Sequence, residues 1–236
     1  MTASDQKMKR PRAIIIIVLS CAIFLCGGHL SHGDPRKHDI GSAGQPSITG
    51  SIGGSVTGNP SLLSDLVVTV NFGELTPINP NGIIKVVVPV AIRSTSEYQV
   101  SVSIAGTFDA NPNSIQPSDI GFGIQNFRAL GTRATACSAN STINSTFNND
   151  PAAAVTIDPL TNRATYPSSL ANIGSSPSLI NGPVLSIFQN IGAWKRETDN
   201  GRAFDAVLAI KPQWFEPGTF TLTLTFRMTT GPDFPC

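Results

Sequence analysis

The sequence predicts an all-β protein, an antiparallel β-sandwich of immunoglobulin-like or Greek-key type, on three observations. Apolar side chains recur at every second position in several windows, most clearly in 218–229, where Phe and Leu alternate with Thr. The chain has 21 Gly and 18 Pro, which suit turns between strands. No window shows helical periodicity of comparable quality, and strands do not alternate with helices. A closed β-barrel is the alternative fold.

The first 33 residues have the features of a cleaved secretory signal peptide. Four basic residues within 7–12 precede an apolar run over 13–26, and small residues allow cleavage after Gly28 or Gly33. The run is shorter than the roughly 18 apolar residues that cross a bilayer. A retained membrane anchor and a lipoprotein signal are therefore the weaker alternatives. We expect the protein to be secreted, periplasmic or on the cell surface.

Residues 34–60 are expected to be a flexible or strand-donating linker rich in Gly and Ser. The stretch 47–58 repeats a four-residue unit of Ser, Ile or Val, Thr or Gly, and Gly three times. If this stretch is extended, Ile48, Ile52 and Val56 share one face. A linker without fixed structure is the plainest interpretation. The alternatives are a spacer to an anchor and a segment that docks as an added strand, in its own domain or in a neighbouring subunit.

Residues 61–236 are expected to form the β-sandwich domain. Its clearest predicted strands lie within 65–73, 83–94, 97–106, 119–130, 204–215 and 218–229. The second of these windows is apolar at nearly every position, as in a strand buried on both faces. Pro89 lacks the N–H that a central strand needs, so it indicates an edge or a bulge. The middle of the domain, 131–201, consists mainly of polar loops with short apolar pieces at 152–157 and 184–191.

Two cysteines, Cys137 and Cys236, remain after removal of a leader that contains Cys21 and Cys26. Outside the cytosol, two cysteines permit one intramolecular disulfide. This bond would attach the Pro-containing tail after the last strand to the domain. Closing a loop of roughly 100 residues stabilises a protein by about 4–5 kcal/mol in the chain-entropy model. A free thiol or an intermolecular bridge is the alternative.

The composition argues against an enzyme and against nucleic acid as a partner. All three histidines, His29, His32 and His38, lie in or just after the leader, so the domain lacks a histidine for nucleophilic catalysis, general base catalysis or zinc ligation. Removal of the leader leaves 12 basic and 14 acidic residues, a net charge near −2, which implies no basic face. We expect no cofactor, no metal and no stable membrane span after cleavage.

One loop has part of a calcium-binding pattern. Asp109, Asn111 and Asn113 occupy the first three ligand spacings of a calcium loop that would extend to Asp119. However, Ser114 stands where such a loop needs Gly, and an apolar residue stands where it needs a bidentate acid. A turn rich in Asn and Asp is the plainer interpretation.

Other candidate site residues have plainer structural interpretations. An acidic group around a predicted hairpin turn could bind calcium or carbohydrate, three aromatic residues could stack on a sugar, and two Asn residues lie in sequons that matter only in a eukaryotic secretory pathway. These residues are Glu197, Asp199 and Asp205; Trp194, Trp214 and Phe215; and Asn140 and Asn144. Turn formation, burial in the core and exposure in polar loops are the respective alternatives.

A leader, a β-rich domain poor in charge, a cysteine pair and a final strand with the sequence PGTFTLTLTF at 217–226 occur together in this chain. In this combination it resembles secreted bacterial pilin-like proteins, the spore coat U type and other fimbrial subunits. In that group an incomplete immunoglobulin-like sandwich polymerises by accepting a strand from the next subunit. The resemblance implies self-association, or association with other surface proteins, through strand pairing.

These observations together predict a non-enzymatic, secreted or surface structural β-sandwich protein of the pilus, fimbria or coat-subunit kind. The alternative is a monomeric secreted binding module that recognises carbohydrate or a surface partner. The two hypotheses differ in whether the mature chain self-associates.

Overall fold

The computed structural model describes ten stretches of the chain. They are residues 38–60, 65–76, 82–94, 98–108, 113–129, 141–160, 163–174, 177–182, 201–213 and 219–230. The chain divides into two compact units, Met1–Arg36 and Lys37–Cys236, and every described residue belongs to the second. The expected signal peptide, residues 1–33, therefore lies outside the described residues.

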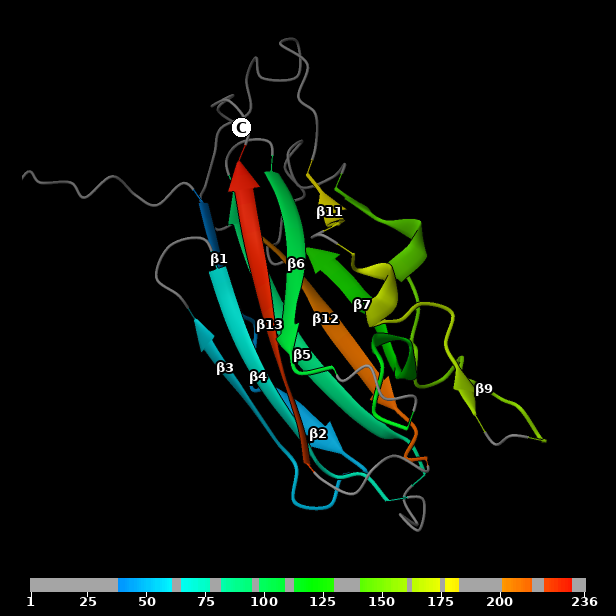
Figure 1. Cartoon of the computed structure of the whole chain (residues 1–236). Helices are drawn as coiled ribbons and strands as arrows, with labels where there is room; N and C mark the ends of the chain where they lie inside the picture. The colour runs from blue at the N-terminus through cyan, green and yellow to red at the C-terminus, as the bar shows by residue number, and fades with distance from the viewer. Residues whose placement is uncertain are drawn as a thin grey trace, which may run out of the picture. The chain divides into compact units, whose positions relative to one another are not determined.

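The described residues form an all-β structure (Figure 1). Besides strands it has the three-residue 3-10 helices η1 (Pro117–Asp119), η2 (Ser145–Phe147) and η3 (Leu170–Asn172). In the part of the chain that the structure describes, no helix is long and apolar enough to span a membrane. The predicted all-β class with antiparallel pairing is confirmed for this part.

Most strands belong to two antiparallel sheets. Sheet A has the order β1-β5-β12-β7, and β2 also pairs with β5. Its strands are β1 (His38–Ser42), β2 (Ser47–Thr49), β5 (Ile84–Ser94), β7 (Ile120–Ala129) and β12 (Gly201–Ile210). Sheet B has the order β3-β4-β13-β6-β11-β8. Its strands are β3 (Ser55–Pro60), β4 (Asp65–Glu74), β6 (Tyr98–Gly106), β8 (Thr142–Ile143), β11 (Ser178–Asn181) and β13 (Thr219–Thr230). A small separate hairpin pairs β9 (Thr156–Ile157) with β10 (Ala164–Thr165).

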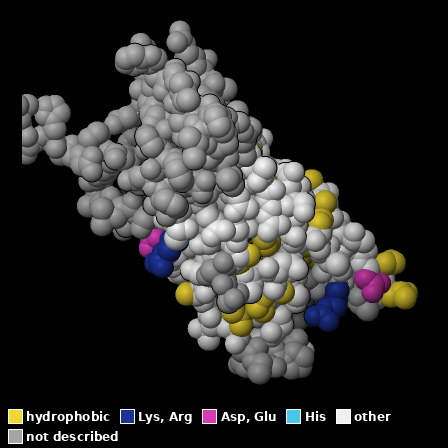
Figure 2. Space-filling model, turned by 90° about the horizontal axis from the view of Figure 1, so that it is seen from above, with side chains coloured by type: hydrophobic (Ala, Val, Ile, Leu, Met, Phe, Trp, Pro, Cys, Tyr) yellow, Lys and Arg dark blue, Asp and Glu magenta, His cyan; other side chains and the backbone are white. Residues whose placement is uncertain are grey.

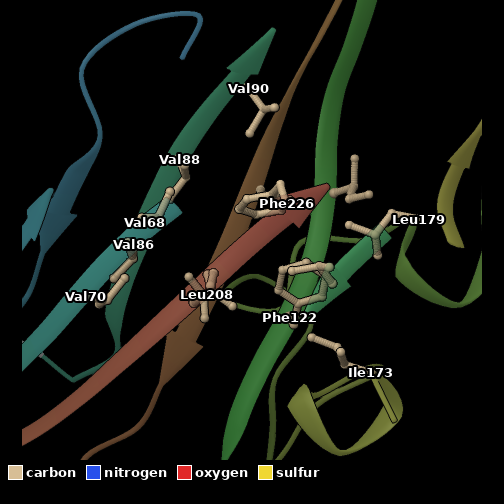
Figure 3. Packing of buried hydrophobic residues seen from close by; sticks show 14 of the residues in the cluster. Val68, Val70, Val86, Val88, Val90, Phe122, Ile173, Leu179, Leu208 and Phe226 are labelled. Atoms are coloured by element: carbon tan, nitrogen blue, oxygen red, sulfur yellow. The ribbon is translucent and has the colours of Figure 1, made fainter. Parts of the chain in front are cut away.

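The two sheets share one hydrophobic core, which follows from the period of two in their sequences. Along β13, Leu222, Leu224 and Phe226 are fully buried, whereas Thr223 and Thr225 between them are partly exposed. Figure 3 shows buried side chains of β4, β5, β7, β12 and β13 meeting between the ribbons. Burying a Val, Leu or Phe side chain contributes about 1.5–3 kcal/mol. This shared core holds the two sheets together.

The last two long strands lie in different sheets. β12 lies between β5 and β7 in sheet A, and β13 lies between β4 and β6 in sheet B. In an immunoglobulin sandwich the last two strands are neighbours in one sheet. The predicted immunoglobulin-like order therefore differs from the observed one. A strand's hydrophobic pattern shows which of its faces is buried, but it does not show which strand lies beside it.

Residues 38–60 are part of the sheets and not a separate linker. β1 and β2 pair with residues 90–94 and 85–87 of β5, along the same edge of that strand. β3 pairs with β4 at an edge of sheet B. The compact unit therefore begins at Lys37 and not at residue 61, because the backbone of this segment completes an edge of each sheet.

Pro89 lies opposite the gap between β1 and β2. The Ala43 backbone N–H donates to the Pro89 carbonyl oxygen at 2.9 Å, so this side of Pro89 faces the gap. Because the N–H and C=O of one strand residue point the same way, the N–H that proline lacks would also face the gap. The sequence predicted an edge strand or a bulge at Pro89. Instead, β5 is an inner strand whose register with β12 is continuous through Pro89, and the gap between β1 and β2 accommodates the missing N–H.

The described residues between β7 and β11, which we call the covering segment, cover part of the outer face of sheet A. The glycines Gly121 and Gly123 of β7 make this possible, since a Cβ on Gly121 would lie 2.5 Å from the ring of Tyr166 and one on Gly123 would collide with the Asn149 carbonyl oxygen. An ion pair of 2.7 Å from Lys85 of β5 to Asp150 ties the same segment to the sheet. The cover brings polar residues from distant parts of the sequence together.

Candidate functional site

Two places in the described structure are candidates for function. The first is residues 38–60, which we call the N-terminal edge segment. The second is a polar depression lined by η1 and by the segment that covers sheet A. The charges around them are few: Figure 2 shows only scattered Lys, Arg, Asp and Glu side chains on the described part of the face in view.

The N-terminal edge segment packs against the shared core through three apolar side chains. Ile40 of β1 is 1% exposed and belongs to the core itself. Ile48 of β2 and Val56 of β3 are partly buried and pack against the core. Ile52, which the repeat pattern placed on the same face, is instead 42% exposed. The segment changes sheets between β2 and β3, so its three repeats do not form one continuous strand.

The connection between β2 and β3 has a defined backbone conformation. Gly50 and Gly53 have positive φ angles of 76° and 70°, which glycine adopts readily. The Ser51 hydroxyl donates to the Phe72 carbonyl oxygen at 2.7 Å. The Glu74 N–H donates to the Ile52 carbonyl oxygen at 3.0 Å. These bonds to β4 hold the crossing from sheet A to sheet B in place.

The polar depression has a volume of about 530 Å³ and lies between η1, the β9–β10 hairpin and the start of η3. Its lining includes Ser118, Asp119, Asp158, Arg163, Thr165 and Tyr166. A volume of this size is within the range of small-molecule pockets, roughly 300–1,000 Å³. The lining combines two carboxylates, one guanidinium and several hydroxyl groups.

Asp119 and Arg163 face each other in this depression. The Asp119 side chain is 6% exposed, and its Oδ1 lies 3.9 Å from Nη2 of Arg163. Its other oxygen, Oδ2, accepts the Gln116 backbone N–H at 2.9 Å, which is part of a capping box around η1. The carboxylate is therefore fixed in place by the backbone that leads into β7.

Tyr166 forms part of the depression wall and is held at both ends. Its ring lies over Gly121, and its hydroxyl accepts the Lys211 backbone N–H at 2.8 Å. Burial raises the pKa of Tyr166 to about 12, the hydrogen bond from Lys211 opposes the shift, and the Asp119 charge adds to it. The phenol is therefore neutral at physiological pH and serves as a fixed wall.

The calcium-loop alternative lies mostly outside the described residues. Asp109 and Asn111 lie outside the described residues, and Asn113 is exposed in a turn. Asp119, the expected far end of the loop, has a backbone N–H and a guanidinium as its neighbours. Within the described ranges, no group of three or more His, Cys, Asp or Glu side chains could hold a metal ion.

Several other predicted residues lie outside the described residues. They are Cys137, Cys236, Glu197, Asp199, Trp194, Trp214, Phe215, Asn140, His29 and His32, together with the side chain of His38. Asp205 lies on β12, where its carboxylate accepts the Asn126 side-chain amide at 2.7 Å and lies 3.9 Å from the Arg128 guanidinium. Asp205 thus has structural partners on the neighbouring strand β7.

Asn144, in the second sequon, uses its side chain to hold η2. Its oxygen accepts the Thr146 N–H at 3.1 Å, and its Nδ2 donates to the Ser178 carbonyl oxygen at 3.0 Å. A glycan would be attached to this same nitrogen. The geometry therefore favours a capping role for Asn144 over glycosylation.

The sequence analysis did not identify Arg163, Thr165 or Tyr166 as site residues. One available signal was the Asp158–Pro159 pair, which favours a turn and thus the hairpin that carries Arg163. Another was the pair of glycines in β7, which in a strand often mark the close approach of another segment.

Comparisons of the chain with protein-family models, curated proteins and solved structures found no match.

Proposed function

We propose that the chain is a secreted or cell-surface structural protein without enzymatic activity, whose copies associate by exchanging the N-terminal edge segment. One observation carries this proposal: residues 38–60 supply an outermost strand to each of the two sheets. A second copy offers the same β5 and β4 edges and the same core position for Ile40. Exchange between copies would therefore keep every contact of the segment, which makes it a low-cost route to assembly.

The strand order gives this proposal indirect support. From the placement of β12 between β5 and β7, and of β13 between β4 and β6, we infer a jelly-roll arrangement. Jelly rolls occur in viral capsid and lectin domains, so the fold is compatible with both assembly and ligand binding. A fold alone does not determine function, and the edge segment is the feature that favours assembly here.

The sequence supports the remaining parts of the proposal. A leader-like stretch in residues 1–33 favours export. The lack of histidine from Asp39 onward disfavours the commonest nucleophilic and metal-dependent catalytic sites. The sequence resemblance to pilin-like and spore coat U proteins, in which a subunit accepts a strand from the next one, favours association through strand pairing.

Cysteine cross-linking between copies tests the proposal. Ser47 of β2 pairs with Val87 of β5. We would prepare one exported chain with Ser47→Cys and another with Val87→Cys, then mix them under conditions that allow exchange and oxidise them. Exchange places the two new thiols in different copies, so a covalent dimer of the two variants is expected on a non-reducing gel.

A pair of central strands provides the matched control. Thr69 of β4 pairs with Thr223 of β13, and neither strand lies at an edge of sheet B. Mixed Thr69→Cys and Thr223→Cys chains should give no covalent dimer. The proposal fails if the mixture of Ser47→Cys and Val87→Cys chains gives no covalent dimer, while a single chain that carries both changes forms an internal disulfide.

A further inference from the structure

We propose that the polar depression binds a neutral carbohydrate. This inference is independent of the proposed strand exchange, because the depression lies between η1 and the segment that covers sheet A and contains no residue of the N-terminal edge segment. It names a binding activity that the assembly proposal does not supply.

The charges of the lining disfavour an ionic ligand. Two carboxylates, Asp119 and Asp158, and one guanidinium, Arg163, line the depression. The excess of one negative charge disfavours an anion, and the guanidinium among the lining groups disfavours a simple cation. A neutral polar ligand avoids both penalties.

The hydrogen-bonding groups specify a ligand that both donates and accepts. A carboxylate only accepts, a guanidinium only donates, and the hydroxyls of Ser118 and Thr165 do both. The 3.9 Å between Asp119 Oδ1 and Arg163 Nη2 is too long for a hydrogen bond. One ligand hydroxyl can lie about 2.8 Å from both atoms, donating to the carboxylate and accepting from the guanidinium. Sugars carry many such hydroxyls.

A peptide strand fits this place less well. An extended peptide usually binds by adding to a sheet edge. At this point the edge of β7 is already paired, because Gly121 forms a bridge with Ser169 and the Phe122 N–H donates to the Ser168 carbonyl oxygen at 3.0 Å. The depression therefore offers side-chain groups and not a free backbone edge.

Two groups that line the depression are held in position before binding. The Gln116 N–H fixes the Asp119 carboxylate, and the Lys211 N–H fixes the Tyr166 hydroxyl. A site with fixed polar groups loses less conformational entropy when a ligand binds. This matters for a neutral ligand, whose individual hydrogen bonds contribute modestly.

An array of glycans tests this inference with the full exported chain. The probes are neutral gluco-, xylo-, manno-, galacto- and chito-oligosaccharides, with sialylated and sulfated glycans as an acidic set. We expect binding to at least one neutral glycan, whose affinity is then measured by calorimetry. Asp119→Asn and Arg163→Gln should each weaken that affinity at least tenfold. The first change removes the carboxylate to which the ligand hydroxyl donates, and the second removes the guanidinium from which it accepts.

Two features keep this test decisive. Arg128→Gln is the matched control, since Arg128 also lies 3.9 Å from a carboxylate, that of Asp205, but on the far part of β7. It should leave the affinity unchanged. Asn at position 119 can still accept the Gln116 N–H, and Arg163 is largely exposed, so both variants should retain the wild-type melting temperature. Absence of binding to every neutral glycan, binding to the acidic set alone, or affinities unchanged in both variants would overturn the inference.

Discussion

Individual side chains determine how closely the covering segment approaches sheet A. Gly121 has no Cβ, so the Tyr166 ring can lie directly against β7, and the Lys211 N–H then fixes the position of the ring through its hydroxyl. Tyr166 is consequently buried, and its pKa is raised to about 12. The ionisation of this one residue is therefore linked to the stability of the domain.

The raised pKa of Tyr166 predicts a loss of stability at alkaline pH. The folded state holds the phenolic proton more tightly than the unfolded state, so the stabilisation is complete below pH 10 and is lost as the pH rises toward 12. This rise in the pKa corresponds to about 3 kcal/mol in the free energy of unfolding. Urea unfolding between pH 9 and pH 12 measures this decline.

The variant Tyr166→Phe separates this effect from other alkaline titrations. It should already be less stable at neutral pH by about 1–3 kcal/mol, because the Lys211 N–H loses its acceptor. Its decline above pH 10 should be smaller than that of the wild type. The chain has two tyrosines, so absorbance at 295 nm in the variant reports Tyr98 alone. If the Tyr166 phenol of the wild type titrates near pH 10 while the protein is still folded, the expected burial of Tyr166 is contradicted.

Residue patterns in the sequence indicated burial better than they indicated sites. Leu222, Leu224 and Phe226 of β13 were expected to face one way, and all are buried. Asp119 was considered only as the end of a calcium loop, because its real neighbour, Arg163, is 44 positions away along the chain. A contact over that distance depends on the path of the covering segment, which no local spacing encodes.

Secondary-structure elements were predicted well where they are long. The bounds of β4, β5, β6, β7 and β13 agree with the predicted windows to within one residue, whereas β12 spans 201–210 and only overlaps its window, 204–215. The short elements were missed, since β8, β9 and β10 have two residues each and cannot display a period of two. β2 and β3 were foreseen only as an alternative, and β1 was not foreseen, because the segment 38–60 is rich in Gly and Ser, and this composition is also typical of an unstructured linker.

Two glycines test the importance of the crossing between β2 and β3. Both Gly50 and Gly53 have positive φ, so replacement by Ala strains the backbone by about 1–2 kcal/mol at either position. An added Cβ at Gly50 would also lie 2.5 Å from the Ile83 carbonyl oxygen, whereas one at Gly53 would meet no atom within 4 Å. Gly50→Ala should therefore lower the free energy of unfolding more than Gly53→Ala, by a further 1–3 kcal/mol or so.

Chemical denaturation of the two variants, measured side by side, gives the difference directly. Gly53→Ala is the control for backbone strain alone. Equal losses in the two variants would mean that the segment after β2 does not pack closely against residue 83, and that the crossing is looser than the structure describes.

On the scale of the whole domain, Tyr98, the first residue of β6, lies beside two described residues that are close in sequence to the two cysteines. The Tyr98 hydroxyl of β6 is hydrogen-bonded to the Ser141 hydroxyl at 2.8 Å, and Tyr98 is also the paired partner of Thr230, the last residue of β13. Ser141 comes four residues after Cys137, and Thr230 comes six residues before Cys236. The cysteines themselves lie outside the described residues.

The four residues from Ser141 to Cys137 reach at most about 14 Å, and the six residues from Thr230 to Cys236 reach at most about 21 Å. Since Ser141 and Thr230 both lie beside Tyr98, the predicted disulfide between Cys137 and Cys236 is compatible with the fold.

We expect the exported, unreduced protein to have a mass two hydrogens below that of the reduced chain and to yield one cross-linked peptide pair. Reduction should lower the free energy of unfolding by up to about 4–5 kcal/mol, since the bond restricts the unfolded chain over a loop of roughly 100 residues. The double variant Cys137→Ser and Cys236→Ser should respond to reductant with no change in stability. Alkylation of both thiols in unreduced protein would refute the bond, and the tail after β13 would then depend on non-covalent contacts alone.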